Sequence, residues 1–179
     1  MTRRETSEFY DKWSKMLYAS ALRVVKDPME AEEAMQDTII KYIAKAGQDE
    51  RHHVAPLSDA QINVWLHKTC IRASIDRLRA RKRRNLFNEE LAAESSEATE
   101  SEPSVLAGLD LSRDMQKVRD TLMELPDKYR VILSLFLFEG YDYQEIAQIT
   151  GQKEVTVRSQ YMRGRERLAE LLKGKLGND

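Results

Sequence analysis

The chain has 179 residues, 41% of them hydrophobic and 33% charged, with a formal net charge of −1. This hydrophobic content is enough for a buried core and excludes an intrinsically disordered chain. The only cysteine, Cys70, excludes an intramolecular disulfide and is typical of a reducing compartment. Because no apolar run approaches the roughly 20 residues of a membrane span, and the N-terminus lacks the apolar core of a signal peptide, we expect a cytoplasmic protein without membrane insertion.

Two amphipathic helices are predicted at the start of the chain. Apolar residues recur near the helical period over residues 6–26, which predicts the first helix. Asp27 and Pro28 then form a helix start, because aspartate can cap the free N–H groups and proline fits the first turn. We expect the second helix to run from Pro28 to about residue 46. Gly47 is expected to end it, since glycine often follows a helix C-terminus.

A third helix with a strongly basic end is predicted after a polar loop. Ser58 and Gln61 have the spacing of a capping box, so the helix should begin at about residue 59. It is expected to run to about residue 83. Basic residues are dense near its end: Arg72, Arg77, Arg79, Arg81, Lys82, Arg83 and Arg84. This density favours a nucleic-acid contact; the alternative is a solvated helix face.

The composition then inverts between residues 86 and 112. This stretch contains acidic residues but no lysine or arginine, and it is interspersed with serine, threonine and proline. Such a composition is typical of a flexible tether. We therefore predict an all-α protein of two small helical domains, residues 1–85 and 113–179, joined by a flexible acidic linker at 86–112.

Helical spacing resumes at Met115, Val118 and Leu122 and begins the second domain. Three helices with two tight turns are predicted after it, between Leu125 and Leu172. Pro126 opens the first helix, and Gly140 ends it. Asp142 and Glu145 have the spacing of a capping box for the second helix, which Gly151 ends after only two turns. The inward face of the third helix is predicted to carry Val157, Tyr161, Gly164 and Leu168.

The last two of these helices have the pattern of a helix-turn-helix motif. Ala147 is small enough to let the helices approach, Gly151 can take a left-handed corner, and Val157 would fill the gap between them. The outward face of the last helix would then lie in a DNA major groove. That face carries Thr156, Arg158, Ser159, Met162 and Arg163. Arginine can bind guanine or phosphate, and serine and threonine donate short hydrogen bonds. The alternative is a three-helix bundle whose arginines only solvate a face.

Both halves of the chain resemble one family, the bacterial RNA polymerase sigma factors of the extracytoplasmic-function (ECF) group. The second conserved region of that family is similar to AEEAMQDTIIKY, and its Trp-Leu helix with a basic end is similar to WLHKTCIRASIDRLRARKRR. The family's fourth region is similar to the stretch from LPDKYR to RERL. Helix-turn-helix domains of response regulators share part of the fourth region, so the two matches in order across a linker are more specific than one.

The resemblance implies a protein without catalytic activity that binds core RNA polymerase and directs promoter-specific transcription initiation. Its contacts with polymerase would come from the second helix, through Glu33, Gln36 and Asp37. Its contacts with the melted minus-ten element would come from Lys68, Arg72, Arg79, Arg81, Arg83 and Arg84. The last helix would read the minus-35 element with the five outward residues named above. Members of this group are usually held inactive by an anti-sigma factor, so such a partner is implied as well.

The sequence can also be compared with the requirements of two other classes of protein. A stand-alone helix-turn-helix regulator with a sensing or partner-binding first domain would not need the basic helix end or the polar surface on the second helix. An enzyme would need a metal-binding cluster or a nucleophile beside a base. Adjacent side chains such as His52 and His53 would point apart on an extended chain, and no cysteine is nearby in the sequence. We therefore predict no catalytic residue, no metal site and no cofactor.

Overall fold

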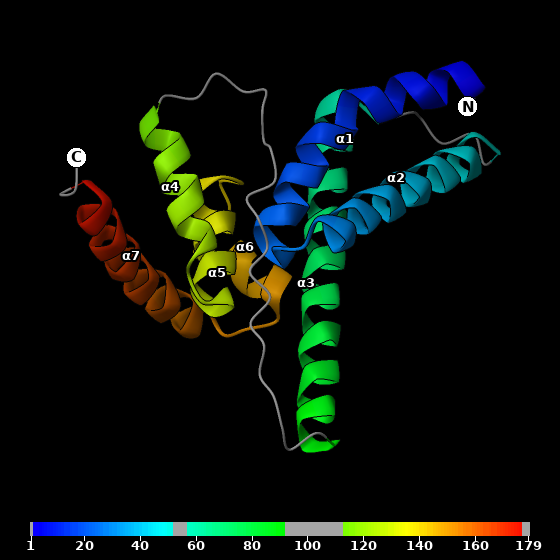
Figure 1. The fold of residues 1–179 in the computed structure, drawn as a ribbon. Coiled ribbons are helices and arrows are strands. Elements are labelled where there is room, and N and C mark those ends of the chain that lie inside the picture. The colour runs from blue at the N-terminus through cyan, green and yellow to red at the C-terminus, as the bar shows by residue number, and fades with distance from the viewer. Residues whose placement is uncertain (1, 52–56, 92–112, 177–179) are drawn as a thin grey trace. The chain divides into compact units, whose positions relative to one another are not determined.

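The fold is all-α, as predicted: every regular element in the described part of the chain is a helix (Figure 1). The computed structural model describes residues 2–51, 57–91 and 113–176. By internal contacts the chain divides into two compact units, residues 1–101 and 102–179. Most of the predicted linker lies outside the described residues.

Three helices form the first unit, and each packs against the other two. They are α1 (Arg3–Val25), α2 (Pro28–Arg51) and α3 (Asp59–Leu91). In Figure 1, α1 and α2 lie side by side, and α3 crosses them. Fully buried apolar side chains fill the space between them, the largest being Leu17, Val24, Val25, Leu66 and Ile71. Cys70 is buried as a small core residue, with its Sγ 3.6 Å from the Leu17 carbonyl oxygen.

Both predicted helix caps in this unit are confirmed, whereas the first helix begins at Arg3, before its predicted start at residue 6. The Glu30 N–H donates to Asp27 Oδ1 at 2.9 Å, which caps α2. At the start of α3, the Gln61 N–H donates to Ser58 Oγ at 3.3 Å, and the Ser58 N–H donates to Gln61 Oε1 at 2.9 Å. These reciprocal bonds satisfy N–H groups that have no partner within the helix.

Two predicted helix ends are wrong. Gly47 does not end α2, which continues to Arg51; the left-handed glycines are Gly140 and Gly151 only, among the described residues. A single glycine can stay helical at a cost of roughly 1 kcal/mol relative to alanine, and no proline follows to break the helix before residue 56. Likewise α3 continues to Leu91, because residues 84–91 contain neither glycine nor proline.

The second unit is built around one short central helix. Its helices are α4 (Arg113–Met123), α5 (Asp127–Leu137), α6 (Tyr143–Thr150) and α7 (Glu154–Leu176). Since α5 contacts α4, α6 and α7, it is buried on several sides, including at Leu133 and Ser134. Arg130 is only 1% exposed, and its guanidinium donates to Asp127 at 2.6 Å. Helical periodicity in a sequence marks a single apolar face, so it does not identify these residues as buried.

The turn between α6 and α7 is the predicted glycine corner. Gly151 ends α6 with a φ of 63°, a left-handed conformation that disfavours a Cβ. At the other end of α6, the Glu145 N–H donates to Asp142 at 2.8 Å, and the Asp142 N–H donates to Glu145 at 3.0 Å. The two caps fix the length of α6, and therefore the point at which α7 begins.

Gly164 sets how closely α7 approaches α5. A Cβ added to Gly164 would lie 3.0 Å from Tyr129 Cβ and 3.1 Å from Leu133 Cδ1. We expect Gly164→Ala to destabilise the protein by about 1–3 kcal/mol, the usual cost of overpacking a core. Gly174→Ala is the matched control, because the same addition there meets nothing within 4 Å. Denaturant unfolding should show a loss for the first variant and none for the second; equal stabilities would contradict this packing.

Candidate nucleic-acid interface

The residues predicted to face a DNA groove lie together on one side of α7. All of them are exposed, namely Thr156, Arg158, Ser159, Met162 and Arg163. On the opposite side Val157, Gly164 and Leu168 are buried, and Tyr161 is half-buried. The predicted inward register of this helix is therefore confirmed, and an exposed polar and basic face remains.

Sequence reasoning missed one residue on this face. Val155 lies in the first turn of α7 and is 77% exposed. Met162 lies about two helical turns further on, near the same side of the helix, and is 44% exposed. In a major groove, apolar side chains of this kind contact the methyl group of thymine. No sequence signal marked Val155, because a valine beside a buried helix residue is equally compatible with a core position.

Arg158 is held in place on the surface of α7. Its Nε and Nη2 atoms donate to Glu154 Oε1 at 3.0 and 2.7 Å. Its Cζ atom lies 5.1 Å from the centroid of the Tyr143 ring. Tyr143 belongs to α6, so the side chain is fixed by both helices of the helix-turn-helix.

Tyr143 is itself part of an aromatic group. Its ring centroid lies 5.1 Å from that of Phe136 on α5 and 5.4 Å from that of Tyr161 on α7. The Phe136 and Tyr161 centroids are 4.5 Å apart, which closes the group. Aromatic pairs at these distances stabilise beyond their buried area. The aromatic group therefore gives α6 a rigid surface beneath the Arg158 guanidinium.

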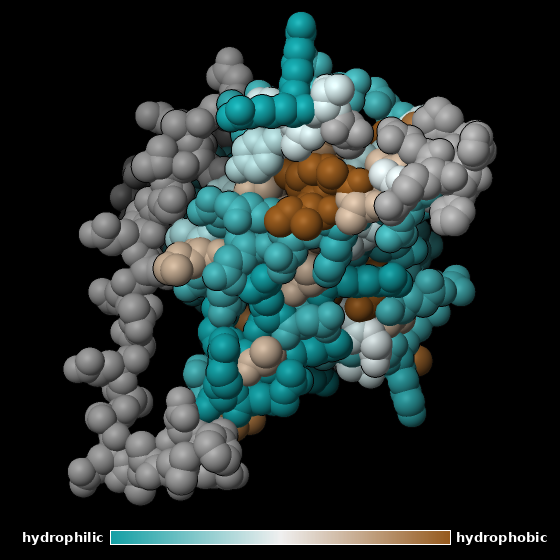
Figure 2. Space-filling model, turned by 90° about the vertical axis from the view of Figure 1, so that its right-hand side faces the viewer, coloured by the Kyte–Doolittle hydropathy of each residue, from teal (hydrophilic) through white to brown (hydrophobic). Residues whose placement is uncertain are grey.

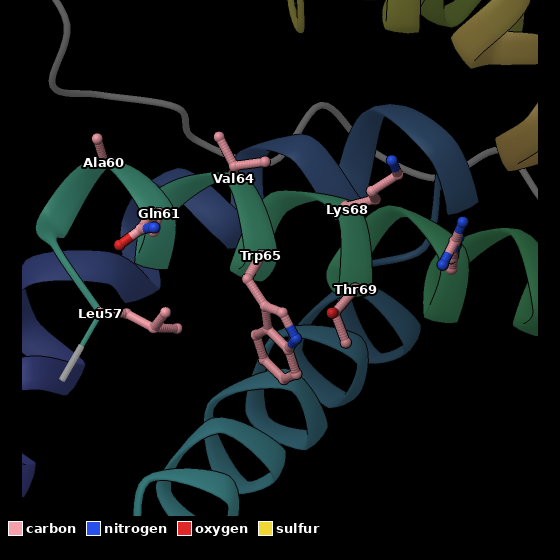
Figure 3. Close-up of a pocket in the computed structure, with 8 residues that line it drawn as sticks. Leu57, Ala60, Gln61, Val64, Trp65, Lys68 and Thr69 are labelled. Atoms are coloured by element: carbon pink, nitrogen blue, oxygen red, sulfur yellow. The ribbon is translucent and has the colours of Figure 1, made fainter. Parts of the chain in front are cut away.

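A second candidate surface is a groove along the first half of α3 (Figure 3). It has a volume of about 530 Å³ and is lined by Leu57, Ala60, Gln61, Val64, Trp65, Lys68, Thr69 and Arg72. The Trp65 ring points toward α2, where its centroid lies 5.7 Å from that of Tyr42. Lys68 and Arg72 add positive charge to a largely apolar lining. An apolar groove beside cations suits an unstacked base next to a phosphate.

A basic stripe continues this face of α3. It consists of Lys68, Arg72, Arg79 and Arg83, whose spacings place them within about 60° of one another around the helix. The three arginines are exposed, and Lys68 is half-buried. Arg79 Nη1 lies 3.6 Å from Asp76 Oδ1. The structure thus aligns four of the six predicted minus-ten residues with the groove.

The remaining two residues of that prediction face α2 instead. Arg81 Nη1 lies 3.0 Å from Glu30 Oε2, and its Nη2 donates to the Val25 carbonyl oxygen at 2.6 Å. Arg84 lies 3.9 Å from the same Glu30 carboxylate. Arg81 therefore joins α3 to the end of α1 and the start of α2, and the structure does not bring it together with the basic stripe.

The predicted polymerase surface lies on α2, opposite the core. Glu33 and Gln36 are exposed and Asp37 is half-buried. Both carboxylates form ion pairs with Arg77 of α3. Two apolar residues share this side of α2 and were missed by sequence reasoning: Met29 is 74% exposed and Ile40 62%. Exposed apolar side chains beside carboxylates favour a protein-binding surface. Such side chains are uncommon on the face shown in Figure 2, which is mostly hydrophilic around one compact apolar patch.

The described residues offer few other candidate sites. No three His, Cys, Asp or Glu side chains among them converge on a position that could hold a metal ion. His52 and His53 lie outside the described part of the chain. None of the helices within it is long and apolar enough to cross a membrane.

Comparison with known proteins links both units to transcription. Residues 115–168 match the family model described as Sigma-70, region 4. The RNA polymerase sigma-H factor of Pseudomonas aeruginosa is 28% identical, over 90% of this chain and 82% of its own length. The ECF RNA polymerase sigma factor SigM of Bacillus subtilis is 24% identical, over 92% of this chain and 93% of its own.

A solved structure is similar across both units. It is the sigma factor RpoE from Bartonella quintana, crystallised in complex with the anti-sigma factor NepR. The two chains share 25% identity with a TM-score of 0.58, and the match covers 95% of this chain and 98% of that one. The similarity thus extends well beyond the helix-turn-helix that the family model matches.

Proposed function

Because the chain belongs to the ECF group of RNA polymerase sigma factors, we propose that it binds core RNA polymerase and directs promoter-specific transcription initiation. The observation that carries this function is the pairing of two surfaces in one chain. One is the exposed face of α7, within the matched region-4 segment; the other is the α3 groove with its basic stripe. A stand-alone regulator would need only the first, and we assign the chain no catalytic role.

Each surface receives one task in this proposal. The outer side of α2, from Met29 to Ile40, docks on core polymerase, with Glu33, Gln36 and Asp37 as its polar contacts. The α3 groove and the basic stripe hold the melted minus-ten strand. The exposed face of α7 binds the minus-35 element. Since α3 continues to Leu91, we take residues 1–91 and 113–179 as the two domains and 92–112 as the linker between them.

An anti-sigma factor is a further proposed partner. The Bartonella quintana relative was crystallised with one, which supports the same kind of partner for this chain. The proposed site of action is the cytoplasm, where RNA polymerase transcribes.

Association with polymerase tests this function directly. The full chain should co-elute with purified core RNA polymerase in size-exclusion chromatography and compete with another sigma factor for it. A chain that binds DNA by itself but never associates with core polymerase would instead be the stand-alone regulator. That result would overturn the proposal.

The basic stripe provides a prediction for the minus-ten contact. Arg72→Gln with Arg83→Gln should reduce open-complex formation. It should also lower the salt slope, which is the steepness with which the logarithm of the binding constant falls with the logarithm of the salt concentration, by about two, because each lost phosphate contact removes about one unit. The matched control is Arg81→Gln with Arg84→Gln, which removes the same charge from the side of α3 that faces α2. The control should lower thermal stability while leaving the salt slope unchanged. Identical salt slopes for the two double variants would contradict the assignment of the stripe.

A further inference from the structure

We propose that Glu154 and Tyr143 position Arg158 so that it reads a base edge in the minus-35 element and is kept from binding phosphate. The inference deepens the proposed function and rests on it, because it requires α7 to enter a major groove. It concerns selectivity: Glu154 is expected to lower affinity for DNA in general and to raise the preference for one base pair.

The hydrogen bonds of Arg158 determine which of its donors are available. Nε and Nη2 both donate to one oxygen of Glu154, at 3.0 and 2.7 Å. This contact occupies the side edge of the planar guanidinium. The end of the group, formed by Nη1 and the outer N–H of Nη2, remains directed away from Glu154. Two parallel N–H groups of this kind are what a guanine edge accepts, through its O6 and N7 atoms.

Tyr143 controls the plane of the same group. The Arg158 Cζ atom lies 5.1 Å from its ring centroid, a distance at which a guanidinium is attracted to an aromatic face. The ring cannot rotate freely, because Phe136 and Tyr161 pack against it. Arg158 thus rests on a surface built from another helix, whereas an ordinary helical ion pair involves only neighbours one turn apart. This second support distinguishes a positioning role from a simple stabilisation of α7.

The charge of Glu154 gives the arrangement its selectivity. In the free protein the pair is weak, because the two side chains are 61% and 42% exposed. In a DNA groove the displaced water would strengthen it, and the carboxylate would repel nearby phosphates. An Arg158 paired with Glu154 therefore gains little from a phosphate alone. Without the carboxylate, Arg158 could turn to the DNA backbone, which is the same for every sequence.

The test uses reconstituted holoenzyme and a library of minus-35 sequences. Glu154→Gln should raise initiation from poor minus-35 sequences by several-fold relative to the best one, flattening the preference at a single base pair. That base pair should be the one affected by Arg158→Ala. When Glu154→Gln is combined with Arg158→Ala, it should have no further effect on the preference, because the effects of substituting two residues in contact are not additive. Tyr143→Leu should also flatten the preference. Tyr143→Phe keeps the ring and should show the same preference as the wild type.

Glu166→Gln is the matched control. Glu166 is an exposed acid on the same helix, so the variant removes the same charge away from Arg158. It should raise binding to all sequences slightly and keep their ranking. If the wild-type holoenzyme shows a clear preference and Glu154→Gln leaves that preference intact, this inference alone is overturned, whatever the thermal stability of the variant. Failure of the wild-type chain to support initiation would overturn the proposed function, and this inference with it.

Discussion

Glu33→Gln combined with Asp37→Asn is expected to weaken binding to core RNA polymerase by roughly 2–5 kcal/mol, the usual cost of removing one side of buried interfacial charge pairs. Both residues lie on the outer side of α2, beside the exposed Ile40. The substitutions remove the charge and keep the size, so the helix itself should be preserved. Titration of core polymerase with labelled variants would measure the change.

The matched control follows from an ion pair that the structure revealed. Both carboxylates also bind Arg77 of α3, so the double variant loses contacts within the protein as well. Arg77→Gln removes the same internal ion pairs while leaving the carboxylates in place. It should bind polymerase nearly as well as the wild type. A loss as large as that of the double variant would mean that the carboxylates only hold α2 to α3.

Arg158→Ala is expected to change the ranking of minus-35 sequences, and Arg163→Ala to lower all of them together. Arg158 lies nearer the N-terminal end of α7, the part that helix-turn-helix proteins place closest to the bases. Losing a bidentate base contact costs roughly 1–3 kcal/mol at one base pair. Arg163, more than a turn further along, is placed to contact phosphate, so its loss should lower the salt slope by about one.

Initiation by reconstituted holoenzyme on a minus-35 library, at several salt concentrations, separates the two effects. Ser159→Ala is a useful third variant, because Ser159 lies beside Arg158 and carries no charge; its loss should leave the salt slope unchanged. A ranking preserved in Arg158→Ala, or altered in Arg163→Ala, would show that α7 enters the groove in another register.

The features that could be predicted from the sequence are those with local causes. The capping boxes at Ser58 and Asp142 and the corner at Gly151 depend on residues a few positions apart. The inward face of α7 follows from helical spacing alone. Gly47 shows the limit of such signals, because glycine permits a helix end without requiring one. Whether the helix ends there depends on the residues around it.

The features that could not be predicted depend on contacts between distant segments. Arg81 is 51 positions from Glu30 and 56 from Val25, so no local pattern linked it to them. For the same reason the basic run looked like one surface, whereas the structure divides it between the stripe and the side facing α2. The contact of Arg158 with Tyr143 is likewise made across the turn between two helices. These contacts determine which substitutions test DNA binding and which serve as controls that affect only the fold.

The most direct test of the central claim is transcription of genomic DNA by core polymerase, with and without the full chain, followed by sequencing of the 5′ ends of the transcripts. The chain should create start sites that core polymerase alone does not use. Those sites should share two upstream elements at a fixed spacing, and the Glu33→Gln, Asp37→Asn variant should lose them all. Start sites identical to those of core polymerase alone, despite folded protein and intact DNA binding, would contradict the account.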